Sequence, residues 1–532
     1  MLPEDKYFQD LTKDEIWQRY CGFLSLTVDE FMQIQQDLLM DQIKRVAVSK
    51  LGKIILGNNI PRTVEEFRQT VPLTRYENYE PYLSEQQVDA LAFKPSIWCH
   101  SSGKGGKFKW FPLSSEFVHK IAKNAIATFI LSTARKEGEV NISPGVRVML
   151  ILAPPPYGSG VMLQATSQYF TMVKLPDLDK FPNLPFSEKI QLGFQMALKQ
   201  GVDIIGSLPS ILTTMGQEFS NRKRTFSMSM LNPKVLYRLS KAMIRSKRNG
   251  RQILPMDLWP AKSVIAGGMD THIYANSIQH YWGIKPYEFY ISSEAFYMAI
   301  HGWNKRWLAF LPDMVFFEFI PMDELRKEEE NKDYVPKTVL LDEVEEGELY
   351  ELVISHFYGM PLLRYRIRDI IKIAALKDED TNVNLPQMLF QRRVDEAINI
   401  GGLAQLDEKT IWQSMANIGL EYNEWTAFKE FEQGTGYLRI LIELKPTELR
   451  KSTDLEKSID EQLRIIDTDY KDIDYYLGMV PIRITLLSNG TFQRYIEEKI
   501  KEGVNPAHIK PVHINPPQTT VQRLLKLSNS KQ

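Results

Sequence analysis

Residues 100–109, which read HSSGKGGKFK, contain the residue types best suited to bind an anion. Glycines leave the backbone amides of a loop open to a phosphate group, and lysines add positive charge. The segment therefore predicts a phosphate-binding loop, with a solvated surface loop as the alternative. A nucleoside triphosphatase of the Walker type is disfavoured, because Lys107 is followed by Phe108 instead of serine or threonine.

Two further groups of candidate residues follow segments that are typical of strands. The apolar run 261–267 ends at Gly267, and the run 287–294 ends in Ser292, Ser293 and Glu294. Ligands in open α/β sheets bind where strands end, so these positions are candidates for a binding site. The histidines do not indicate a metal site, because His100, His356 and His508 lack ligand spacing.

The elements that must position these residues indicate an α/β fold class. Apolar periodicity predicts helices within 5–56 and over 115–136, and apolar β-rich runs predict strands at 146–153 and 314–321. A helix, strand and helix are expected over 186–219. Strands at 348–355 and 362–373 are expected to pair around the Gly359 turn.

The pattern changes near residue 393 to that of a small α+β domain. Helices are predicted at 408–418 and 447–467, a hairpin over 425–444, and a strand at 480–487. A basic helix should begin near Gly490, and residues 519–532 should form a frayed tail. We therefore predict a large N-terminal domain of β-sheets packed by helices over 1–393, which would bind ATP and an acid, and a small mobile C-terminal domain over 394–532.

Composition restricts the partners of the chain. Its 532 residues carry a formal net charge of −1. This near-neutral charge does not favour nucleic acid or an anionic membrane as the main partner. Cys21 and Cys99 stand far apart, which fits a reducing compartment, and the N-terminus lacks a secretory signal. We expect a cytoplasmic protein that is a monomer or a weak dimer.

The basic clusters 222–224 and 245–251 are expected to be solvated faces, and the charge run 324–333 is expected to be an exposed insertion.

The order of these motifs resembles that of the adenylate-forming superfamily of acyl-CoA synthetases, peptide-synthetase adenylation domains and luciferases. The motifs are a serine-glycine-lysine loop, an aromatic-x-Ser-Ser-Glu strand end, a Tyr-Arg-x-x-Asp strand and an Arg-x-Asp linker. Within the superfamily, the chain most resembles the auxin-responsive Gretchen Hagen family of acyl acid amido synthetases, including its bacterial branch. The runs that carry this likeness are 71–77, 289–294, 316–321 and 347–354, and the likeness spans roughly 61–511.

The resemblance implies ATP and Mg²⁺ as cofactors and gives each matching residue a role. The phosphate loop would comprise Ser101, Ser102, Gly103, Lys104, Gly105, Gly106 and Lys109. Tyr290 would lie beside the adenine, Ser293 at the α-phosphate, and Glu294 would bind Mg²⁺ through hard oxygen atoms.

Further roles fall near the domain boundary and in the C-terminal domain. Asp369 would accept hydrogen bonds from the ribose hydroxyls. Arg393 would also contact the ribose, and Asp395 would act as the hinge. Lys510 would be the catalytic lysine that meets the α-phosphate, with Lys499 and Lys501 as competing candidates.

Other interpretations remain open for single residues. Tyr290 and Tyr365 could be ordinary strand aromatics, and Lys510 an ordinary surface lysine. Glu294 and Asp369 could pair with local arginines such as Arg364 and Arg366.

Two departures from the superfamily pattern leave the ATP site in question. Lys104 and Gly105 replace two hydroxyl residues that normally contact the β- and γ-phosphates. Lys104 could supply a point charge in their place, without their directionality. Arg368 stands where the family more often has glycine, and this would place a bulky cation near the ribose.

The activity implied by the resemblance is formation of an acyl-adenylate from ATP and a small-molecule carboxylic acid, followed by transfer of the acyl group to an amine such as an amino acid. An acyl-CoA ligase, which would use a thiol acceptor, is one alternative. A catalytically degenerate nucleotide- or acyl-binding homologue is another. The acid should bind to small, apolar and aromatic residues of 153–169, 206–215 and 267–274.

Overall fold

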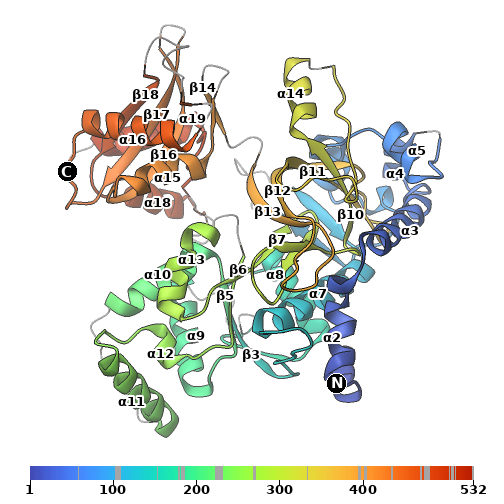
Figure 1. Ribbon diagram of the computed structural model, residues 1–532, viewed down its shortest axis with the longest axis horizontal. Coiled ribbons are helices and arrows are strands. Elements are labelled where there is room, and N and C mark those ends of the chain that lie inside the picture. The colour runs from blue at the N-terminus through green and yellow to red at the C-terminus, as the bar shows by residue number, and fades with distance from the viewer. Residues whose placement is uncertain are drawn as a thin grey trace. The chain divides into compact units, whose positions relative to one another are not determined.

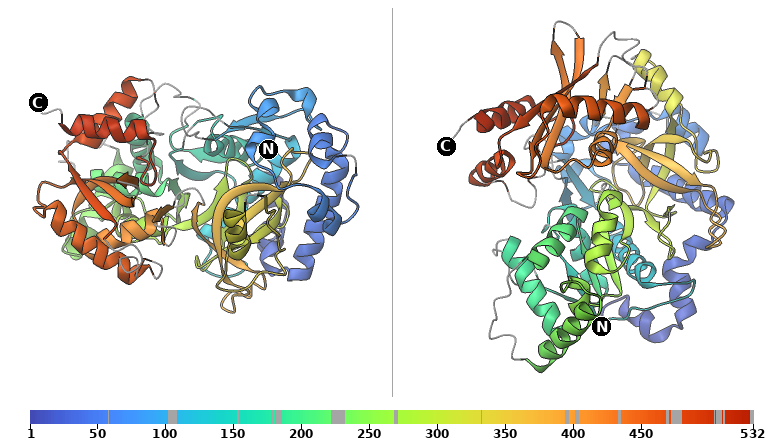
Figure 2. Two further views of the ribbon diagram at one scale, coloured as in Figure 1. Left: turned by 90° about the horizontal axis from the view of Figure 1, so that it is seen from above. Right: turned by 60° about the vertical axis from the view of Figure 1, so that its left-hand side comes forward.

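The computed structural model divides into two compact units, Met1–Gln391 and Arg392–Gln532, which Figures 1 and 2 draw in colours that follow the chain. The structure describes residues 1–57, 59–101, 109–152, 154–177, 180, 186–221, 232–267, 271–331, 333–393, 397–400, 404–432, 435–467, 470–471, 480–502, 504, 509 and 511–529.

Helices begin the N-terminal unit, as the apolar periodicity predicts. Capping boxes start two of them, where Thr12 accepts a hydrogen bond from the amide of Glu15 and Thr27 accepts one from the amide of Glu30. The helices are α1 (Asp5–Asp10), α2 (Lys13–Cys21), α3 (Val28–Val46), α4 (Lys50–Leu56), α5 (Val64–Thr70) and α6 (Glu80–Leu83), with 3₁₀ turns at Gly22–Ser25, Tyr76–Asn78 and Val88–Ala90.

An 11-stranded sheet organises the same unit, in the order β10-β11-β12-β13-β9-β8-β7-β6-β5-β3-β4. The strands β3 to β7 pair in parallel, and the pairs β7–β8, β8–β9, β9–β13, β11–β12 and β10–β11 are antiparallel. Their bounds are β3 (Val146–Leu150), β4 (Met172–Lys174), β5 (Ile204–Ser207), β6 (Ser263–Gly267), β7 (Tyr287–Ser292), β8 (Phe296–His301), β9 (Leu308–Phe310), β10 (Val315–Pro321), β11 (Leu349–His356), β12 (Tyr365–Ala375) and β13 (Gln387–Arg393).

Both faces of the parallel half are covered by helices, which explains why its strands are apolar throughout. Val148, Ile204 and Ile265 belong to the core that includes α7 (Ser115–Thr133) and α8 (Gly158–Tyr169). The neighbouring Ile205 and Val264 belong to a second core. The helices that supply this second core are α9 (Phe186–Gln200), α10 (Pro209–Asn221), α11 (Pro233–Arg248), α12 (Pro255–Leu258) and α13 (Thr271–Trp282).

The C-terminal unit is a three-stranded sheet with a hydrophobic core on each face. Trp425, Ile440 and Ile484 belong to the first core, together with α15 (Glu408–Asn417) and α16 (Ser452–Ile466). Leu441 and Leu487 belong to the second, together with α18 (Thr491–Lys501) and α19 (Gln518–Asn529). The strands are β16 (Tyr422–Glu432), β17 (Thr435–Leu444) and β18 (Ile482–Leu487), with a separate hairpin of β14 (Ile398–Ile400) and β15 (Ala404–Leu406).

Two expectations from the sequence are wrong. The charge run 324–333 falls partly in α14 (Met322–Glu330), where Glu324 and Leu325 are buried, so it is not simply an exposed insertion. The segment 519–532 is not a frayed tail over 519–529, because α19 buries Val521 and Leu524. In both cases a few apolar residues at helical spacing outweigh a largely polar composition. No helix in the described part of the chain is long and apolar enough to cross a membrane.

Candidate functional site

A short hairpin holds the two ends of the glycine-lysine segment together. Strand β1 (Ile97–His100) pairs antiparallel with β2 (Trp110–Leu113), and the amide of Ser101 donates to the carbonyl of Lys109 over 3.0 Å. The amide of His100 donates to the carbonyl of Pro156 over 3.0 Å, which attaches the hairpin to the turn before α8. Ser102, Gly103, Lys104, Gly105 and Gly106 lie outside the described residues.

Ser293 lies in the connection between β7 and β8, next to this hairpin. A Cβ atom added to Gly158, the first residue of α8, would be 3.4 Å from the Ser293 hydroxyl and 3.7 Å from the sulfur of Cys99 in β1. The glycine therefore permits close approach of helix, hairpin and strand end. This geometry brings the α-phosphate candidate to the root of the phosphate-loop candidate.

Glu294 is buried at the same place, with 8% of the residue exposed. Its backbone carbonyl accepts a hydrogen bond from His356 Nε2 over 2.9 Å. Burial raises the pKa of Tyr76 to about 12, and the charge of Glu294 adds to that rise. Burial also raises the pKa of Cys99, again with a contribution from Glu294. The carboxylate is thus close enough to act electrostatically on both side chains.

Tyr76 links Glu294 to the end of the loop. The Tyr76 hydroxyl accepts a hydrogen bond from the amide of Trp110 over 2.8 Å, and Lys109 Nζ lies 5.2 Å from the centre of the Tyr76 ring. The Glu294 carboxylate acts electrostatically on Tyr76, and Lys109 lies over its ring, so a carboxylate and a lysine suited to a metal-bound phosphate share one neighbourhood. The sequence singled out Lys109 and Glu294 but not Tyr76, whose place depends on a contact between distant segments.

Tyr290 and Asp369 form a second cluster of candidate residues. The Tyr290 hydroxyl in β7 donates to Asp369 Oδ2 in β12 over 2.6 Å. The Tyr290 ring stacks on Phe390 in β13, with ring centres 6.1 Å apart and planes at 27°. Phe390, which the sequence did not single out, precedes Arg393 by three residues on the same strand. The side chain of Arg393 lies outside the described residues, as do Asp395 and Lys510.

The arginines near these carboxylates have other partners. Arg364 is paired with Glu318 at 2.9 Å, and Arg366 is paired with Glu351 at 2.7 Å and with Glu328 at 2.6 Å. These ion pairs of Arg364 and Arg366 are therefore with carboxylates other than Glu294 and Asp369.

Arg368 occupies a special backbone position. Its φ of +70° lies in the left-handed region that favours glycine, which gives a conformational reason for the glycine more common in the family. The Arg368 guanidinium is 3.7 Å from Glu351 Oε2. Glu351 also pairs with Arg366, so Arg368 extends a buried ion-pair cluster beside Asp369.

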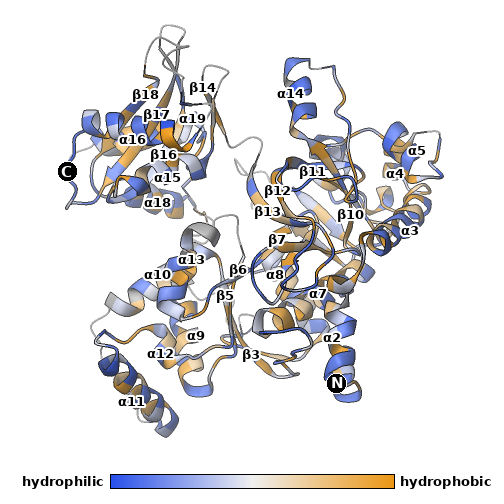
Figure 3. Ribbon diagram, in the orientation of Figure 1, coloured by the Kyte–Doolittle hydropathy of each residue, from blue (hydrophilic) through white to orange (hydrophobic). Residues whose placement is uncertain are grey.

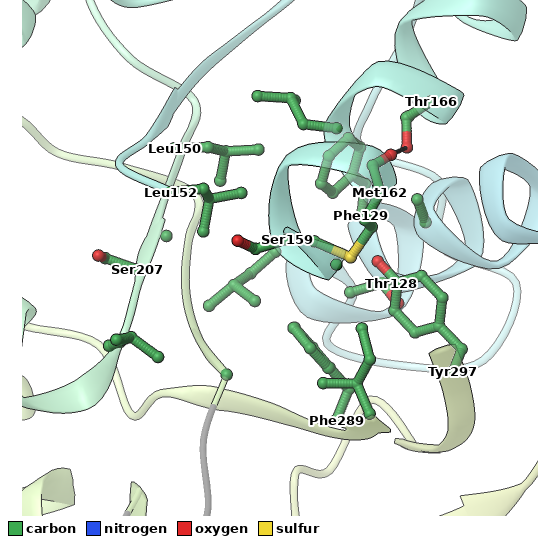
Figure 4. Close-up of a pocket in the computed structure, with 18 of the residues that line it drawn as sticks. Thr128, Phe129, Leu150, Leu152, Ser159, Met162, Thr166, Ser207, Phe289 and Tyr297 are labelled. Carbon is green, nitrogen blue, oxygen red and sulfur yellow. Dashed lines mark hydrogen bonds between the residues drawn. The ribbon is translucent and has the colours of Figure 1, made fainter. Parts of the chain in front are cut away.

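An elongated cavity of about 340 Å³ reaches Ser293, and Figure 4 shows most of its lining side chains. Gly267 lies on its wall, where an added Cβ atom would be 2.8 Å from the Phe289 ring. The segments 153–169 and 206–215 contribute, but so do α7, β3, β7 and β8. The lining residues are Ala125, Thr128, Phe129, Leu150, Leu152, Gly158, Ser159, Met162, Leu163, Thr166, Gly206, Ser207, Leu208, Ile265, Gly267, Phe289, Ile291, Ser292, Ser293 and Tyr297.

One polar pair interrupts this apolar wall. The side chains of Thr128 and Tyr297 lie side by side in Figure 4. Thr128 Oγ1 is buried without a hydrogen bond of normal geometry among the described residues. Burial raises the pKa of Tyr297, and the nearby Thr128 hydroxyl opposes this rise, so Tyr297 remains a donor at neutral pH. The Thr128 hydroxyl, which has no hydrogen-bond partner among the described residues, could therefore donate its proton to a ligand.

The donor set around Glu294 determines which metal ion the site fits. Within the described residues, no group of three or more His, Cys, Asp or Glu side chains could hold a metal ion. Mg²⁺ at phosphate sites is commonly held by one or two carboxylates together with phosphate oxygens. A lone carboxylate beside a phosphate-loop candidate fits Mg²⁺ bound with a nucleotide.

Comparison with solved structures supports the fold. The AtGH3.15 acyl acid amido synthetase in complex with 2,4-DB aligns with a TM-score of 0.68 at 17% identity, covering 100% of this chain and 98% of that chain. The 2-hydroxyisobutyryl-CoA ligase in the postadenylation state, in complex with 2-HIB-AMP, aligns with a TM-score of 0.60 at 12% identity, covering 97% and 94%. Both likenesses concern the fold alone.

Comparison of sequences identifies the family. Jasmonoyl-L-amino acid synthetase GH3.5 of Oryza sativa subsp. japonica is 28% identical over 293 residues, which are 50% of this chain and 48% of the relative. The alignment therefore spans about half of that relative's length. Models of the GH3 family N-terminal, central and C-terminal domains match residues 22–193, 308–393 and 408–518 in that order. The resemblance inferred from the motifs is confirmed, and the chain belongs to the GH3 family.

Proposed function

We propose that this protein is an ATP-dependent ligase that activates a carboxylic acid as its acyl-adenylate and transfers the acyl group to the amine of an amino acid. The observation that carries the proposal is that the loop root and Ser293 lie together beside an apolar cavity, with Glu294 as the next residue, in a chain of the GH3 family. Tyr290 lies in β7, three residues before Ser293, and its hydroxyl donates to Asp369 in β12. This pair supplies groups suited to a nucleoside.

In the first reaction, a carboxylate oxygen of the acid attacks the α-phosphorus of ATP. The bond between the α-phosphorus and the bridging oxygen breaks, and pyrophosphate leaves. Residues 101–109 would hold the phosphates through backbone amides and lysines, and Ser293 would donate to the α-phosphate. Asp369 would accept from the ribose hydroxyls, with Tyr290 beside the adenine and Arg393 near the ribose. Mg²⁺ held by Glu294 would neutralise phosphate charge.

In the second reaction, the amine nitrogen attacks the acyl carbon, the bond from that carbon to the phosphate oxygen breaks, and AMP leaves as the nitrogen loses a proton. We assign ATP and acid binding to residues 1–393, and a mobile role to residues 394–532, with Asp395 as hinge and Lys510 as the lysine at the α-phosphate. The reaction would take place in the cytoplasm, in a monomer or weak dimer.

The cavity restricts the acid. Its volume of about 340 Å³ lies at the lower end of ligand pockets, and its wall is mainly apolar. The Thr128 hydroxyl would donate a hydrogen bond to an acceptor on the acid. We therefore propose a small, mainly apolar acid that carries one hydrogen-bond acceptor away from its carboxylate.

Product analysis by mass spectrometry tests this function. The chain is incubated with Mg-ATP, the twenty amino acids or coenzyme A, and pairs of aromatic, indolic and fatty acids with and without a distal oxygen. We expect an amide, formed best from acids with the distal oxygen. Thr128→Val should lower that preference by roughly two- to tenfold, because one neutral hydrogen bond is lost. A thioester with coenzyme A and no amide would instead establish the acyl-CoA ligase.

A further inference from the structure

Helix α11 exposes a set of large apolar side chains at the periphery of the helical layer over the parallel strands (Figure 1). Leu236, Tyr237, Met243 and Ile244 are 48%, 67%, 59% and 66% exposed. Single exposed apolar residues are ordinary, but these recur at helical spacing. At about 100° per residue, they fall within an arc of about 120° of the helix surface, which also includes the exposed Ser240 and Lys247.

The opposite face already anchors α11 to the unit. Val235, Ala242 and Ser246 are buried, and Ser246 Oγ donates to the carbonyl of Arg251. Arg238 Nη1 donates to the carbonyl of Ala197 over 2.7 Å, near the end of α9. The exposed apolar arc therefore has no part in holding the helix in place, and its residues can be changed without loss of the fold.

Cations are concentrated along one side of the apolar arc, and Lys247 lies within it. The helix carries six basic residues and no acidic one, namely Lys234, Arg238, Lys241, Arg245, Lys247 and Arg248. Residues 222–251 together contain ten Lys or Arg and no Asp or Glu, in a chain whose net charge is −1. Within the part of the chain that the structure describes, no ion pair of 4.0 Å or less involves Lys241, Lys247 or Arg248. Blue and orange segments alternate along α11 in Figure 3.

We propose that α11 binds the surface of an anionic lipid bilayer, with Leu236, Tyr237, Met243 and Ile244 inserted among the lipid head groups. Helices that lie in a membrane interface combine an apolar arc with a face rich in lysine and arginine. Each such cation is attracted by anionic lipids, and the apolar side chains add burial that a purely ionic contact lacks. The sequence predicts that the basic clusters are solvated faces. Solvation explains their charge, but it does not explain the exposed apolar side chains beside them.

Other occupants fit this face less well. A second copy of the helix would place six cations against six, which repel. Nucleic acid would use the cations but gain little from four exposed apolar side chains. The inference does not rest on the proposed ligase activity, because no residue of α11 lines the cavity or the nucleotide site.

Co-sedimentation of the full chain with lipid vesicles tests the proposal. The vesicles contain phosphatidylcholine alone, or phosphatidylcholine with about one third phosphatidylglycerol, at low salt and at about 0.1 M salt. We expect binding to the anionic vesicles only. Met243→Ser combined with Ile244→Ser should weaken it about tenfold or more, because both apolar side chains lose their burial. Lys241→Gln combined with Lys247→Gln should weaken it to a similar extent.

A matched control changes two exposed apolar residues elsewhere in the same unit. Val48 and Ile54 are 73% and 51% exposed, and Val48→Ser combined with Ile54→Ser should bind as the wild type does. If the wild-type chain stays in solution with anionic vesicles, the proposal is overturned. An acidic protein would then be the favoured partner of this face of α11. Equal binding by the Met243/Ile244 variant also overturns it, because adsorption would then be ionic alone.

A label at the helix reports insertion directly. The two native cysteines, Cys21 and Cys99, are both buried, so a cysteine introduced by Ile244→Cys can be labelled selectively with an environment-sensitive dye. We expect a blue shift on addition of anionic vesicles, and none for a label placed by Val48→Cys. An unshifted dye at position 244 in vesicle-bound protein would contradict insertion.

Discussion

At the scale of single residues, the contact between Tyr290 and Asp369 determines what the nucleotide candidate can do. The hydroxyl fixes one carboxylate oxygen at 2.6 Å, while the Phe390 ring fixes the tyrosine from the other side. An oriented acceptor is what recognition of a ribose diol requires. The two residues therefore act together. We expect a substitution of Asp369 to impair ATP binding more than a substitution of Tyr290.

Asp369→Asn is expected to raise the KM for ATP by roughly 10- to 100-fold, because a hydrogen bond to a charged acceptor is lost. Tyr290→Phe keeps the ring and should raise it less than Asp369→Asn does. Steady-state kinetics of adenylate formation with varied ATP measures both, and circular dichroism checks the fold. Asp369→Asn with an unchanged KM for ATP would remove Asp369 from the site.

Residue identity and order in the sequence were enough to select Glu294, Ser293 and Asp369, because each follows or lies in a recognisable strand. The sequence could not select Tyr76 or Phe390, since their relevance arises from contacts between segments far apart in the chain. The loss of glycine at Arg368 was visible, but the positive φ that explains the usual glycine depends on the irregular pairing of β12 with β11.

At the scale of elements, the sequence predicted the strands and helices with strong apolar periodicity. It did not reveal that residues 97–100 and 110–113 pair as a hairpin, because four-residue strands carry little periodicity. It also misjudged α14 and α19, whose few apolar residues become informative only when their packing partners are known.

In the C-terminal unit, residues 511–515 run beside β16 and are held by His513. The His513 ring stacks on Trp425 at 4.6 Å and contacts Glu424 through Nε2 at 2.7 Å. Burial alone would lower the pKa of His513, but hydrogen bonds to Glu408 and Glu424 outweigh it and raise the pKa to about 10. A protonated imidazole between two carboxylates therefore fixes the segment that follows Lys510 in sequence.

His513 should make the C-terminal unit sensitive to alkaline pH. Its pKa is higher in the folded chain than its ordinary value of 6.5, so its stabilisation is full below pH 6.5 and is lost as the pH rises toward 10. His513→Gln should lower stability at neutral pH by on the order of 2–4 kcal/mol and should flatten this pH dependence. Urea unfolding between pH 6.5 and 10 measures it, with the exposed His280→Gln as control. Parallel curves for the wild type and His513→Gln would refute this role.

At the scale of the whole molecule, the chain combines a doubly covered sheet with a separate α+β unit. Motif order along the chain was sufficient to predict this family and fold class. Spacing alone could not reveal that eleven strands form one sheet. It also could not reveal that the pairing changes from parallel to antiparallel between β7 and β8, next to Ser293 and Glu294. The crevice that Ser293 lines lies beside this change of strand direction.

The central claim is that this crevice makes acyl-adenylates, and ATP–pyrophosphate exchange tests it most directly. Exchange is measured with Mg²⁺ across the acid panel, for the wild type and for Glu294→Gln, with thermal shift by ATP as a check on binding. We predict exchange that depends on one class of acid and falls by about 100-fold or more in Glu294→Gln. Exchange unchanged in that variant, or ATP binding without exchange for any acid, would contradict the account.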